Sequence, residues 1–232
     1  MLAGCGKKND KADENTNVNI VHRDQTQQSE NAGNGEGQAP AKNYDVLLDE
    51  RPEEERYQYS MDDLSLVDTV SGKMITLGMT KADLEKIAGA PQIEQPDFTV
   101  YDGVIVQYTE QETAGSLVVS GGMFKDTEQA TRYKTVRGVA ISTDFEDFVK
   151  AYGDQYNEKT GSGEGESAKE TPSNAIRYFR VDGQKVEYLG TSLTEEMKAA
   201  GTENLYMQDF MFGRDSNQVV SMRVTSLALA GK

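Results

Sequence analysis

The sequence predicts an α+β fold: two tandem helix-plus-antiparallel-sheet repeats that form one layered domain, preceded by a disordered tether. One pattern occurs twice, at 75–89 and 139–153: a short apolar entry, a helix-capping residue, an amphipathic helix and a closing glycine. An Asp-Gly pair between alternating apolar residues follows each copy, and this is a strong signal for a β-hairpin. Residues 6–60 are poor in large apolar side chains, so they bury too little surface to offset the entropy of ordering them.

Composition limits the class of protein. The chain has 232 residues, of which 36% are hydrophobic, and it contains no tryptophan. Its formal net charge is −15, whereas binding of nucleic-acid phosphates needs clusters of Lys and Arg. We therefore expect no nucleic-acid partner. No apolar run approaches the length of about 18 residues that spans a membrane as a helix.

Cys5 is the only cysteine, which excludes an intrachain disulfide and a cysteine-rich metal site. The segment Leu2-Ala3-Gly4-Cys5 resembles the lipobox of bacterial lipoproteins, in which this cysteine becomes the lipidated N-terminus. Residues 1–5 are therefore interpreted as a lipobox remnant, and Cys5 as a lipid anchor at the outer surface of a bacterial cell membrane. A signal peptide needs a charged and an apolar region upstream, and only Met1 precedes Leu2. A late start site, a trimmed chain and a chance match are the three explanations.

Residues 6–60 are interpreted as a flexible tether, within which Val46-Leu47-Leu48 is the one apolar cluster. About 50 flexible residues have a root-mean-square reach of roughly 40 Å. This reach would lift a domain from the bilayer into a cell wall, which favours a Gram-positive host.

The folded domain is expected at 61–232, with repeat 1 at about 74–138. In this repeat Thr80 is a good N-cap, Leu84, Ile87 and Ala88 form one apolar helix face, and Gly89 ends the helix. Strands are expected around the Asp-Gly hairpin and after it, at 101–108, 116–124 and 131–141.

Repeat 2, at about 139–229, follows the same plan. Asp144 is the expected N-cap and Gly153 the closing residue, with an aromatic-rich apolar face between them. The polar segment 157–172 is interpreted as a mobile surface insertion. A short helix capped by Ser192 is expected before the last hairpin. Strands are expected at 181–188, 205–212 and 218–227.

These motifs resemble a known family. They are Gly78-Met79-Thr80-x-x-Asp83-Leu84-x-x-x-x-Gly89-x-Pro91, the hairpin after it, and the second helix ending in Tyr152-Gly153. Over roughly 75–227 the pattern resembles the tandem-repeat family of the β-lactamase inhibitor protein, and small outer-membrane lipoproteins of the SmpA/OmlA type have a single related unit. The resemblance implies one layered α+β domain with a broad concave sheet face that binds other proteins.

The chain departs from this family in two places. Ile141-Ser142 stands where Gly-x-Ser is usual, and the disulfides of the inhibitor proteins are absent. No motif here matches the residues with which the inhibitor contacts its target, so the resemblance assigns no contact residues.

Elimination leaves little room for catalysis or cofactors. His22 is the only histidine and lies in the expected tether, which removes Ser-His-Asp and Cys-His sites and histidine-based zinc sites. The turn aspartates Asp102, Asp182 and Asp215 lack the spacing of a calcium loop. We therefore expect no catalytic residues, no metal and no cofactor. A pair of carboxylates acting in glycoside hydrolysis remains the enzymatic alternative.

Strand alternation suggests a binding face. Val104, Val106 and Tyr108 should face the core, as should Val186 and Tyr188, and also Val220, Met222 and Val224 in the last hairpin. The candidates for partner binding are the residues with the opposite parity, namely Met207, Met211, Arg223, Ile105, Gln107, Lys185 and Glu187. Exposed Met and Arg among polar residues suit protein contacts. A sheet covered on both sides, with the Met residues in a core, is the alternative.

The sequence thus predicts a membrane-anchored surface lipoprotein whose domain binds an envelope or extracellular protein, as an inhibitor or in envelope assembly. A small carboxylate-dependent envelope hydrolase and a passive structural lipoprotein are the other two hypotheses.

Overall fold

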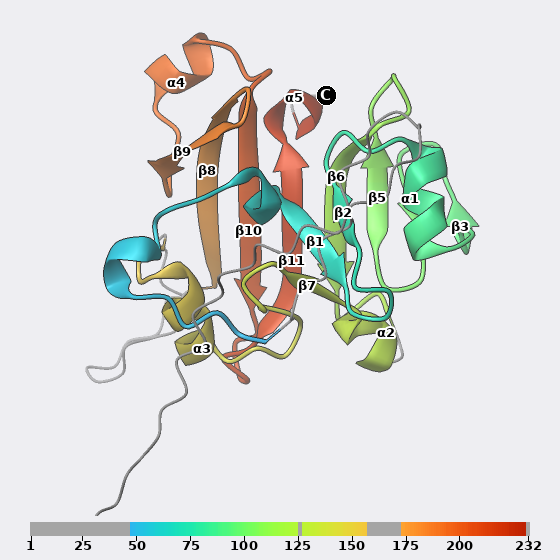
Figure 1. Cartoon of the computed structure of the whole chain (residues 1–232), viewed down its shortest axis with the longest axis horizontal. Coiled ribbons are helices and arrows are strands. Elements are labelled where there is room, and N and C mark those ends of the chain that lie inside the picture. Colours follow the sequence, from blue (N-terminus) through green and yellow to red (C-terminus); the bar gives the residue numbers. More distant parts are fainter. Residues whose placement is uncertain (1–46, 125–126, 157–172, 231–232) are drawn as a thin grey trace, which may run out of the picture. The chain divides into compact units, whose positions relative to one another are not determined.

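The computed structural model describes residues 47–124, 127–156 and 173–230. Two antiparallel sheets and several short helices make up this part of the chain (Figure 1). The large sheet contains β3 (Ile93–Glu94), β4 (Thr99–Val100), β5 (Ile105–Tyr108), β6 (Ala114–Ser120), β8 (Asn174–Asp182), β9 (Lys185–Gly190), β10 (Leu205–Phe212) and β11 (Val219–Ser226). The small sheet contains β1 (Ser65–Asp68), β2 (Met74–Thr76) and β7 (Tyr133–Thr135). The helices are η1 (Glu53–Glu55), η2 (Met61–Leu64), α1 (Lys81–Ala88), α2 (Thr127–Thr131), α3 (Phe145–Tyr152), α4 (Glu195–Ala199) and α5 (Leu227–Ala230).

The predicted α+β fold is confirmed. The strand order of the large sheet is β3-β4-β5-β6-β11-β10-β8-β9, and that of the small sheet is β2-β1-β7. Repeat 1 supplies one half of the large sheet and repeat 2 the other half. The halves join where β6 pairs with β11, with Ser116 opposite Thr225 and Ser120 opposite Ser221. One continuous sheet therefore unites the two repeats.

Both long helices lie where the sequence predicts them. Thr80 Oγ1 accepts from the amide of Asp83 at 3.2 Å at the start of α1. Asp144 precedes α3 without capping it through its side chain, and its carboxylate accepts from Gln218 Nε2 at 3.1 Å instead. The closing glycine of α3, Gly153, has φ of +80°, and a Cβ there would lie 2.5 Å from the Tyr57 hydroxyl. Glycine is required at this position on both counts.

The two Asp-Gly hairpins form, but with turn geometry different from that predicted. Asp-Gly is a hairpin signal because it suits a type I′ turn, in which both central residues have positive φ. In the described residues only Gly103 and Gly183 have positive φ in these turns, and Asp102 and Asp182 do not. The first turn has Asp102-Gly103 at its centre, since the Tyr101 amide donates to the Val104 carbonyl. The second has Gly183-Gln184 at its centre, because Asp182 is paired with Lys185.

The third strand pairs differently in the two repeats. In repeat 1, β6 pairs with β5, the second strand of the hairpin. In repeat 2, β10 pairs with β8, the first strand of the hairpin. The second strand, β9, is therefore left at the edge of the large sheet.

One predicted strand, one helix cap and one core residue need correction. The segment 131–141 is not one long strand, because α2 extends to Thr131 and β7 covers only Tyr133–Thr135 before the chain turns. The small sheet as a whole was not predicted, since its strands are three or four residues long. Thr194, not Ser192, caps α4. Val220, expected in the core, is 38% exposed because the β10–β11 register shifts at Met211 and Phe212.

The predicted tether extends too far into the domain. Residues 1–46, which include the lipobox remnant, Cys5 and His22, lie outside the described residues, as does the predicted insertion 157–172. Residues 49–60, however, pack on the domain: the amide of Asp49 donates to the Arg137 carbonyl at 3.0 Å. The rings of Tyr59 and Phe179 contact edge to face at 4.8 Å. Ordered structure thus begins before Met61.

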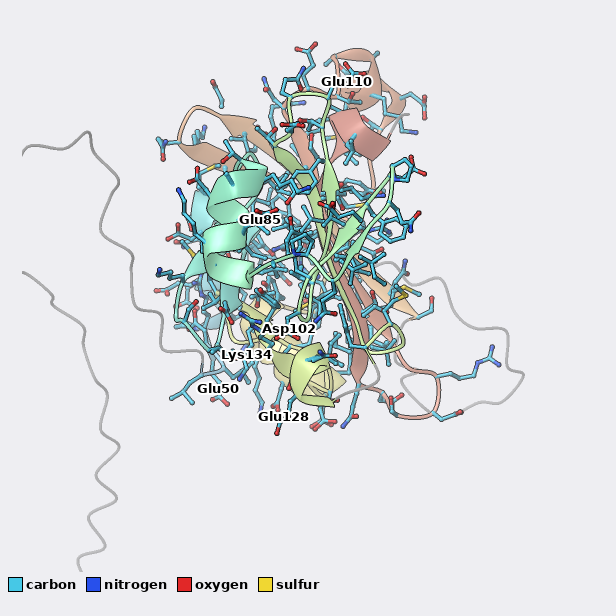
Figure 2. All side chains as sticks on the ribbon, turned by 90° about the vertical axis from the view of Figure 1, so that its right-hand side faces the viewer. Glu50, Glu85, Asp102, Glu110, Glu128 and Lys134 are labelled. Atoms are coloured by element: carbon cyan, nitrogen blue, oxygen red, sulfur yellow. The ribbon has the colours of Figure 1, made fainter. Side chains whose placement is uncertain are left out.

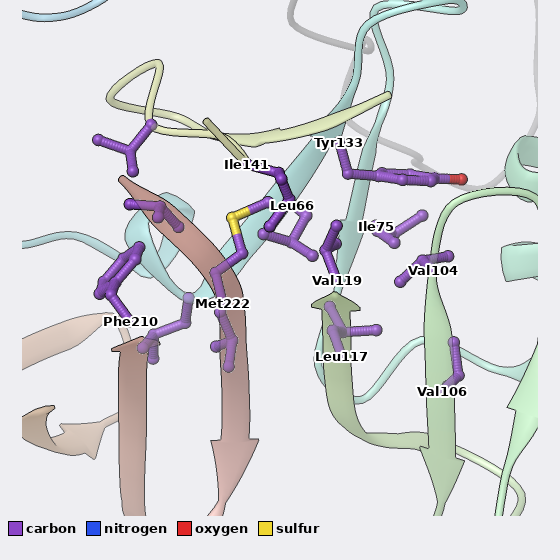
Figure 3. Packing of buried hydrophobic residues seen from close by; sticks show 14 of the residues in the cluster. Leu66, Ile75, Val104, Val106, Leu117, Val119, Tyr133, Ile141, Phe210 and Met222 are labelled. Carbon is purple, nitrogen blue, oxygen red and sulfur yellow. The ribbon is translucent and has the colours of Figure 1, made fainter. Parts of the chain in front are cut away.

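The hydrophobic core fills the space between the two sheets (Figure 3). Leu66 of β1 and Ile75 of β2 meet Leu117 and Val119 of β6, and all four side chains are fully buried. Met222 of β11 lies beside them in the same layer (Figure 3). The small sheet therefore covers the seam between the two halves of the large sheet.

Helix α3 covers the second half of the large sheet with aromatic rings. Phe148 lies 5.0 Å from Phe210 and 5.2 Å from Phe212, measured between ring centroids. Tyr152 lies 5.1 Å from Phe210. Such ring pairs add about 0.5–1.5 kcal/mol each beyond the burial of their area.

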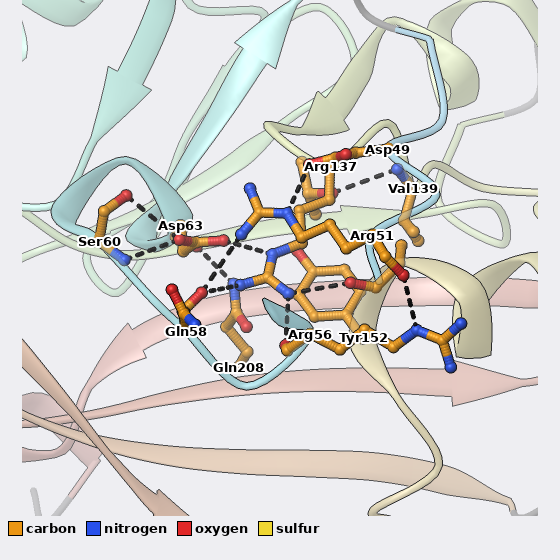
Figure 4. A network of polar contacts seen from close by, with 12 residues as sticks. Asp49, Arg51, Arg56, Gln58, Ser60, Asp63, Arg137, Val139, Tyr152 and Gln208 are labelled. Carbon is orange, nitrogen blue, oxygen red and sulfur yellow. Dashed lines mark hydrogen bonds and ion pairs between the residues drawn. The ribbon is translucent and has the colours of Figure 1, made fainter. Parts of the chain in front are cut away.

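Arg137 is fully buried at the centre of a polar network beneath α3 (Figure 4). Its Nε donates to Asp63 Oδ1 at 2.6 Å, and its Nη2 donates to the Gln58 carbonyl at 2.7 Å. Nη1 donates to the carbonyls of Arg56 at 2.7 Å and Ala151 at 2.9 Å. One guanidinium thus joins the segment 56–63, the loop after β7 and the end of α3.

We expect Arg137→Met to lower the free energy of unfolding by about 3–5 kcal/mol, because it leaves the buried Asp63 carboxylate without its counter-charge. Urea denaturation measures the change. Arg214→Met, in the exposed turn between β10 and β11, is the matched control and should change stability by less than about 0.5 kcal/mol. Equal effects of the two substitutions would contradict this account of Arg137.

A second ion cluster joins the small sheet to the first hairpin. Arg132 donates to both carboxylate oxygens of Asp68, at 2.8 and 3.0 Å, and to Asp102 Oδ2 at 2.6 Å. Burial by itself would raise the pKa of Asp68. Hydrogen bonds from Arg132, Ser71 and the Val70 amide outweigh burial and lower the pKa of Asp68 below its usual value.

The lowered pKa of Asp68 predicts a component of acid sensitivity. A depressed pKa gives stability that is fully present above the unfolded-state pKa of about 3.9 and is lost as the pH falls through the folded-state value. Asp68→Asn should reduce stability at neutral pH by about 1.5–3 kcal/mol and flatten the decline below about pH 4. Unfolding measured between neutral and acidic pH tests this. Asp97→Asn, at an exposed loop position, should leave the pH profile unchanged.

Candidate functional site

The covering elements of the large sheet pack mainly on one of its faces. Phe148 of α3 contacts Phe210 and Phe212 on this face, and the small sheet packs against Leu117 and Val119. We call this the inner face, and the opposite side of the same strands the outer face. Figure 2 shows the large sheet from the side of α1, which lies to one side of it.

All seven residues predicted for partner binding lie on the outer face. Strand register places Ile105 opposite Val118, Gln107 opposite Ser116, and Met207 opposite Thr225. The remaining four follow from the same alternation. They are Met211 on β10, Arg223 on β11, and Lys185 and Glu187 on β9.

The seven residues do not form one compact cluster. They extend from β5 to β9, which are five strand spacings apart, or about 24 Å at roughly 4.8 Å per spacing. Met211 is 49% exposed, Met207 is half-buried, and Arg223 is exposed. Lys185 and Glu187 lie on the edge strand, three strand spacings from Arg223.

A row of directly opposed residues crosses the middle of the outer face. Ile105 is opposite Val118, Val118 opposite Arg223, Arg223 opposite Asp209, and Asp209 opposite Ile176. The three apolar members are each half-buried. The centre of the outer face is therefore a short apolar row with one ion pair in it.

The ion pair in this row is asymmetric. Arg223 Nη2 donates to Asp209 Oδ2 at 2.9 Å, and the Arg223 side chain is 44% exposed while that of Asp209 is 9% exposed. The other carboxylate oxygen of Asp209 is buried and has no hydrogen-bond partner among the described residues. The side of the pair that reaches solvent is therefore the guanidinium.

Sequence reasoning missed Asp209, Val118 and Ile176. Asp209 lies between Met207 and Met211 at the same parity, so alternation along β10 could have included it. Ile176 was not predictable, because the first half of β8 was not assigned to a strand in the sequence interpretation. Val118 lies on the same side of β6 as Ser116 and Ser120. Because both of these neighbours are polar, the sequence shows no apolar alternation that would identify Val118.

Helix α5 and an acidic surface border this region. Helix α5 contacts β10 and β11 at the end of the sheet where β10 begins, and Leu229 lies close to Gly115. The exposed carboxylates Glu110 and Glu128 and the half-buried Glu85 are distributed over the side of the molecule that faces the viewer in Figure 2. A partner with an acidic surface would be repelled there.

A cavity of about 410 Å³ lies where η2 and β2 meet β6 and β10. Leu64, Leu77 and Tyr206 line it together with several hydroxyl side chains, and Asp62 is the one carboxylate in its lining. Carboxylate-dependent glycoside hydrolysis uses two such groups, and this cavity supplies one of them.

A hollow of about 470 Å³ beside Arg132 contains two carboxylates, Asp102 and Glu128. Asp102 there accepts from Arg132 Nη1 at 2.6 Å. Within the described residues, no three His, Cys, Asp or Glu side chains are grouped so that they could hold a metal ion. In the same part of the chain, no helix is long and apolar enough to cross a membrane.

Comparisons with known proteins identify no family. No family model matches this chain, and no curated protein matches it. A search of solved structures found a likeness to an extracellular protein containing an SCP domain from Bacillus anthracis str. Ames, with a TM-score of 0.34 and 14% sequence identity. The match covers 65% of this chain and 44% of that chain. At this TM-score the likeness supports no argument about fold or function.

Proposed function

We propose that this chain is a bacterial surface lipoprotein, anchored through Cys5, whose α+β domain binds another protein of the envelope or the extracellular space without catalysis. The observation that supports it best is the outer face. Its centre presents partly exposed apolar side chains and one exposed guanidinium on a rigid sheet. We further propose that the chain is related to the tandem-repeat family of the β-lactamase inhibitor protein. The helix and the hairpin that occur in both repeats support this relationship.

The physical argument begins with the contrast between the two faces of the sheet. The inner face is buried under α1, α3 and the small sheet. On the outer face Ile105, Val118 and Ile176 remain half-buried, and Met211 is 49% exposed. Apolar and methionine side chains left partly in water gain free energy when a partner covers them, at roughly 25 cal/mol per Å².

Arg223 indicates the chemistry of the partner. Its side chain is 44% exposed and uses Nη2 for Asp209, so the rest of the planar donor group can bind an acceptor on a partner. Arginine and methionine are enriched at the centres of protein interfaces. The partner proposed here is therefore a folded protein whose contact surface offers apolar side chains around a carboxylate or carbonyl oxygen.

The absence of catalysis is part of the proposal and rests on residue types. The single histidine, His22, and the single cysteine, Cys5, belong to the predicted tether and lipobox. The carboxylate Asp102 beside the larger hollow is engaged by Arg132. The described residues therefore contain neither histidine nor cysteine, so a Ser-His or Cys-His pair of nucleophile and general base cannot form among them.

The outer-face assignment predicts that Met207→Asp combined with Met211→Asp abolishes capture of the partner. The full chain is crosslinked in envelope extract of its host, and captured proteins are purified and tested for direct binding. Two buried carboxylates without partners should weaken direct binding at least tenfold, that is by about 1.4 kcal/mol or more.

The matched control is Leu47→Asp combined with Val70→Asp. These two positions are 72% and 78% exposed and lie outside the large sheet, so the control adds the same charge elsewhere. A partner that binds both double variants equally well would refute the outer-face assignment.

Anchoring predicts acyl mass on Cys5 in protein isolated from its native host. Mass spectrometry of the intact N-terminal peptide measures it. Cys5→Ser should remove the acyl mass and release the protein from the membrane fraction. A chain that retains a free Met1 terminus in the native host would be incompatible with a lipid anchor at Cys5.

A further inference from the structure

Strand β9 forms an open edge of the large sheet. It is six residues long, and among the strands that the structure describes it pairs only with β8. The strand at the opposite edge, β3, has two residues. A long edge strand with free backbone groups is a template for pairing with another chain, so β9 is the edge at which such pairing would occur.

The turn before β9 determines which backbone groups point outward. Gly183 and Gln184 form a two-residue turn, so Asp182 and Lys185 are the hydrogen-bonded pair that closes the hairpin. Backbone groups alternate along an antiparallel strand. Those of Lys185 and Glu187 therefore face β8, and those of Val186 and Tyr188 face away. The described residues offer Val186 and Tyr188 no backbone partner on that side.

The charges on β9 are arranged in a self-complementary way. Lys185 and Glu187 are both exposed and both on the outer face, on either side of Val186. If a second β9 pairs antiparallel with Val186 opposite Val186, then Lys185 of each copy lies opposite Glu187 of the other. Opposite charges directly across two strands contribute roughly 0.2–1 kcal/mol per pair.

We propose that two copies of this chain associate through β9, with a two-fold axis at Val186. The outward amide and carbonyl of Val186 exchange two hydrogen bonds with the same groups of the second copy. Two Lys185–Glu187 ion pairs flank them on the outer face. The two large sheets then continue into one another. Lys185 and Glu187, which strand alternation suggests as partner-binding candidates, belong to the dimer interface in this arrangement, while the centre of the outer face at Arg223 lies three strand spacings away.

Backbone and charge select the same register. Moving the axis to Lys185 or to Glu187 would place like charges opposite each other. It would also bring together residues whose backbone groups face β8. A shift by half a residue spacing would put Lys185 opposite Val186 and mix the two sheet faces. The register centred on Val186 avoids all of these conflicts.

A charge-reversal cycle on the full chain tests the proposal by sedimentation velocity over a wide concentration range. Lys185→Glu alone and Glu187→Lys alone each turn two attractive pairs into repulsive ones, so each should weaken dimerisation by about tenfold. The variant with both reversals restores opposite charges and should restore dimerisation. Lys86→Glu, exposed on α1, controls for the change in net charge.

Val186→Pro provides a second, independent measurement. Because the Val186 amide points away from β8, proline should leave the hairpin intact but remove the central hydrogen bonds of the dimer. Thermal unfolding verifies that the variant is folded. The proposal is overturned if the wild-type chain stays monomeric at all concentrations, or if the double reversal dimerises no better than the single ones. Dimerisation that survives in folded Val186→Pro also overturns it.

Discussion

The buried guanidinium of Arg137 is the interaction on which the arrangement of this domain depends. Burying a cation costs several kcal/mol, and a counter-charge and hydrogen-bond acceptors around it offset this cost. Asp63 supplies the charge, and the carbonyls of Arg56, Gln58 and Ala151 supply acceptors. The rings of Tyr59 and Tyr152 lie 4.3 and 4.7 Å from its central carbon. Hydrogen bonds from the Arg137 guanidinium, which is far away in sequence, thus hold the segment before β1 in the domain.

A second buried guanidinium explains why α3 occupies this place on the sheet. Arg177 of β8 is fully buried, and its Nη2 donates to the carbonyls of Tyr152 and Gly153 at 3.2 and 3.4 Å. Arg137 donates to the neighbouring carbonyl of Ala151. Both cations therefore lie at the C-terminal end of α3, where free carbonyls and the helix dipole favour positive charge. Arg177 Nε and Nη1 are buried without a hydrogen-bond partner among the described residues, so the carbonyls of α3 are the acceptors that its guanidinium reaches. Both arginines hold α3 on the inner face, and the middle of the outer face remains accessible.

Local patterns in the sequence were enough to predict what local interactions stabilise. Capping residues, apolar spacing and closing glycines identify α1 and α3, and alternation identifies the face of Met207 and Arg223. The small sheet was not predictable, because strands as short as Met74–Thr76 have no period to detect and form only against the core. The same holds for residues 49–60, which are polar in sequence and ordered through Arg137. Val220 was misassigned because a bulge depends on the register of two strands and not on either one alone.

The difference between the two repeats follows from the length of one connection. Residues 109–113 join β5 to β6, and a loop this short can only return the chain beside β5 as a hairpin. Residues 191–204 join β9 to β10 and include α4, which is long enough to cross to the far side of β8. Once β10 occupies that side, β9 has no second neighbour beside β8 among the described strands. The longer connection thus creates the exposed edge, and the alternation of Lys185, Val186 and Glu187 determines which strand can complete it.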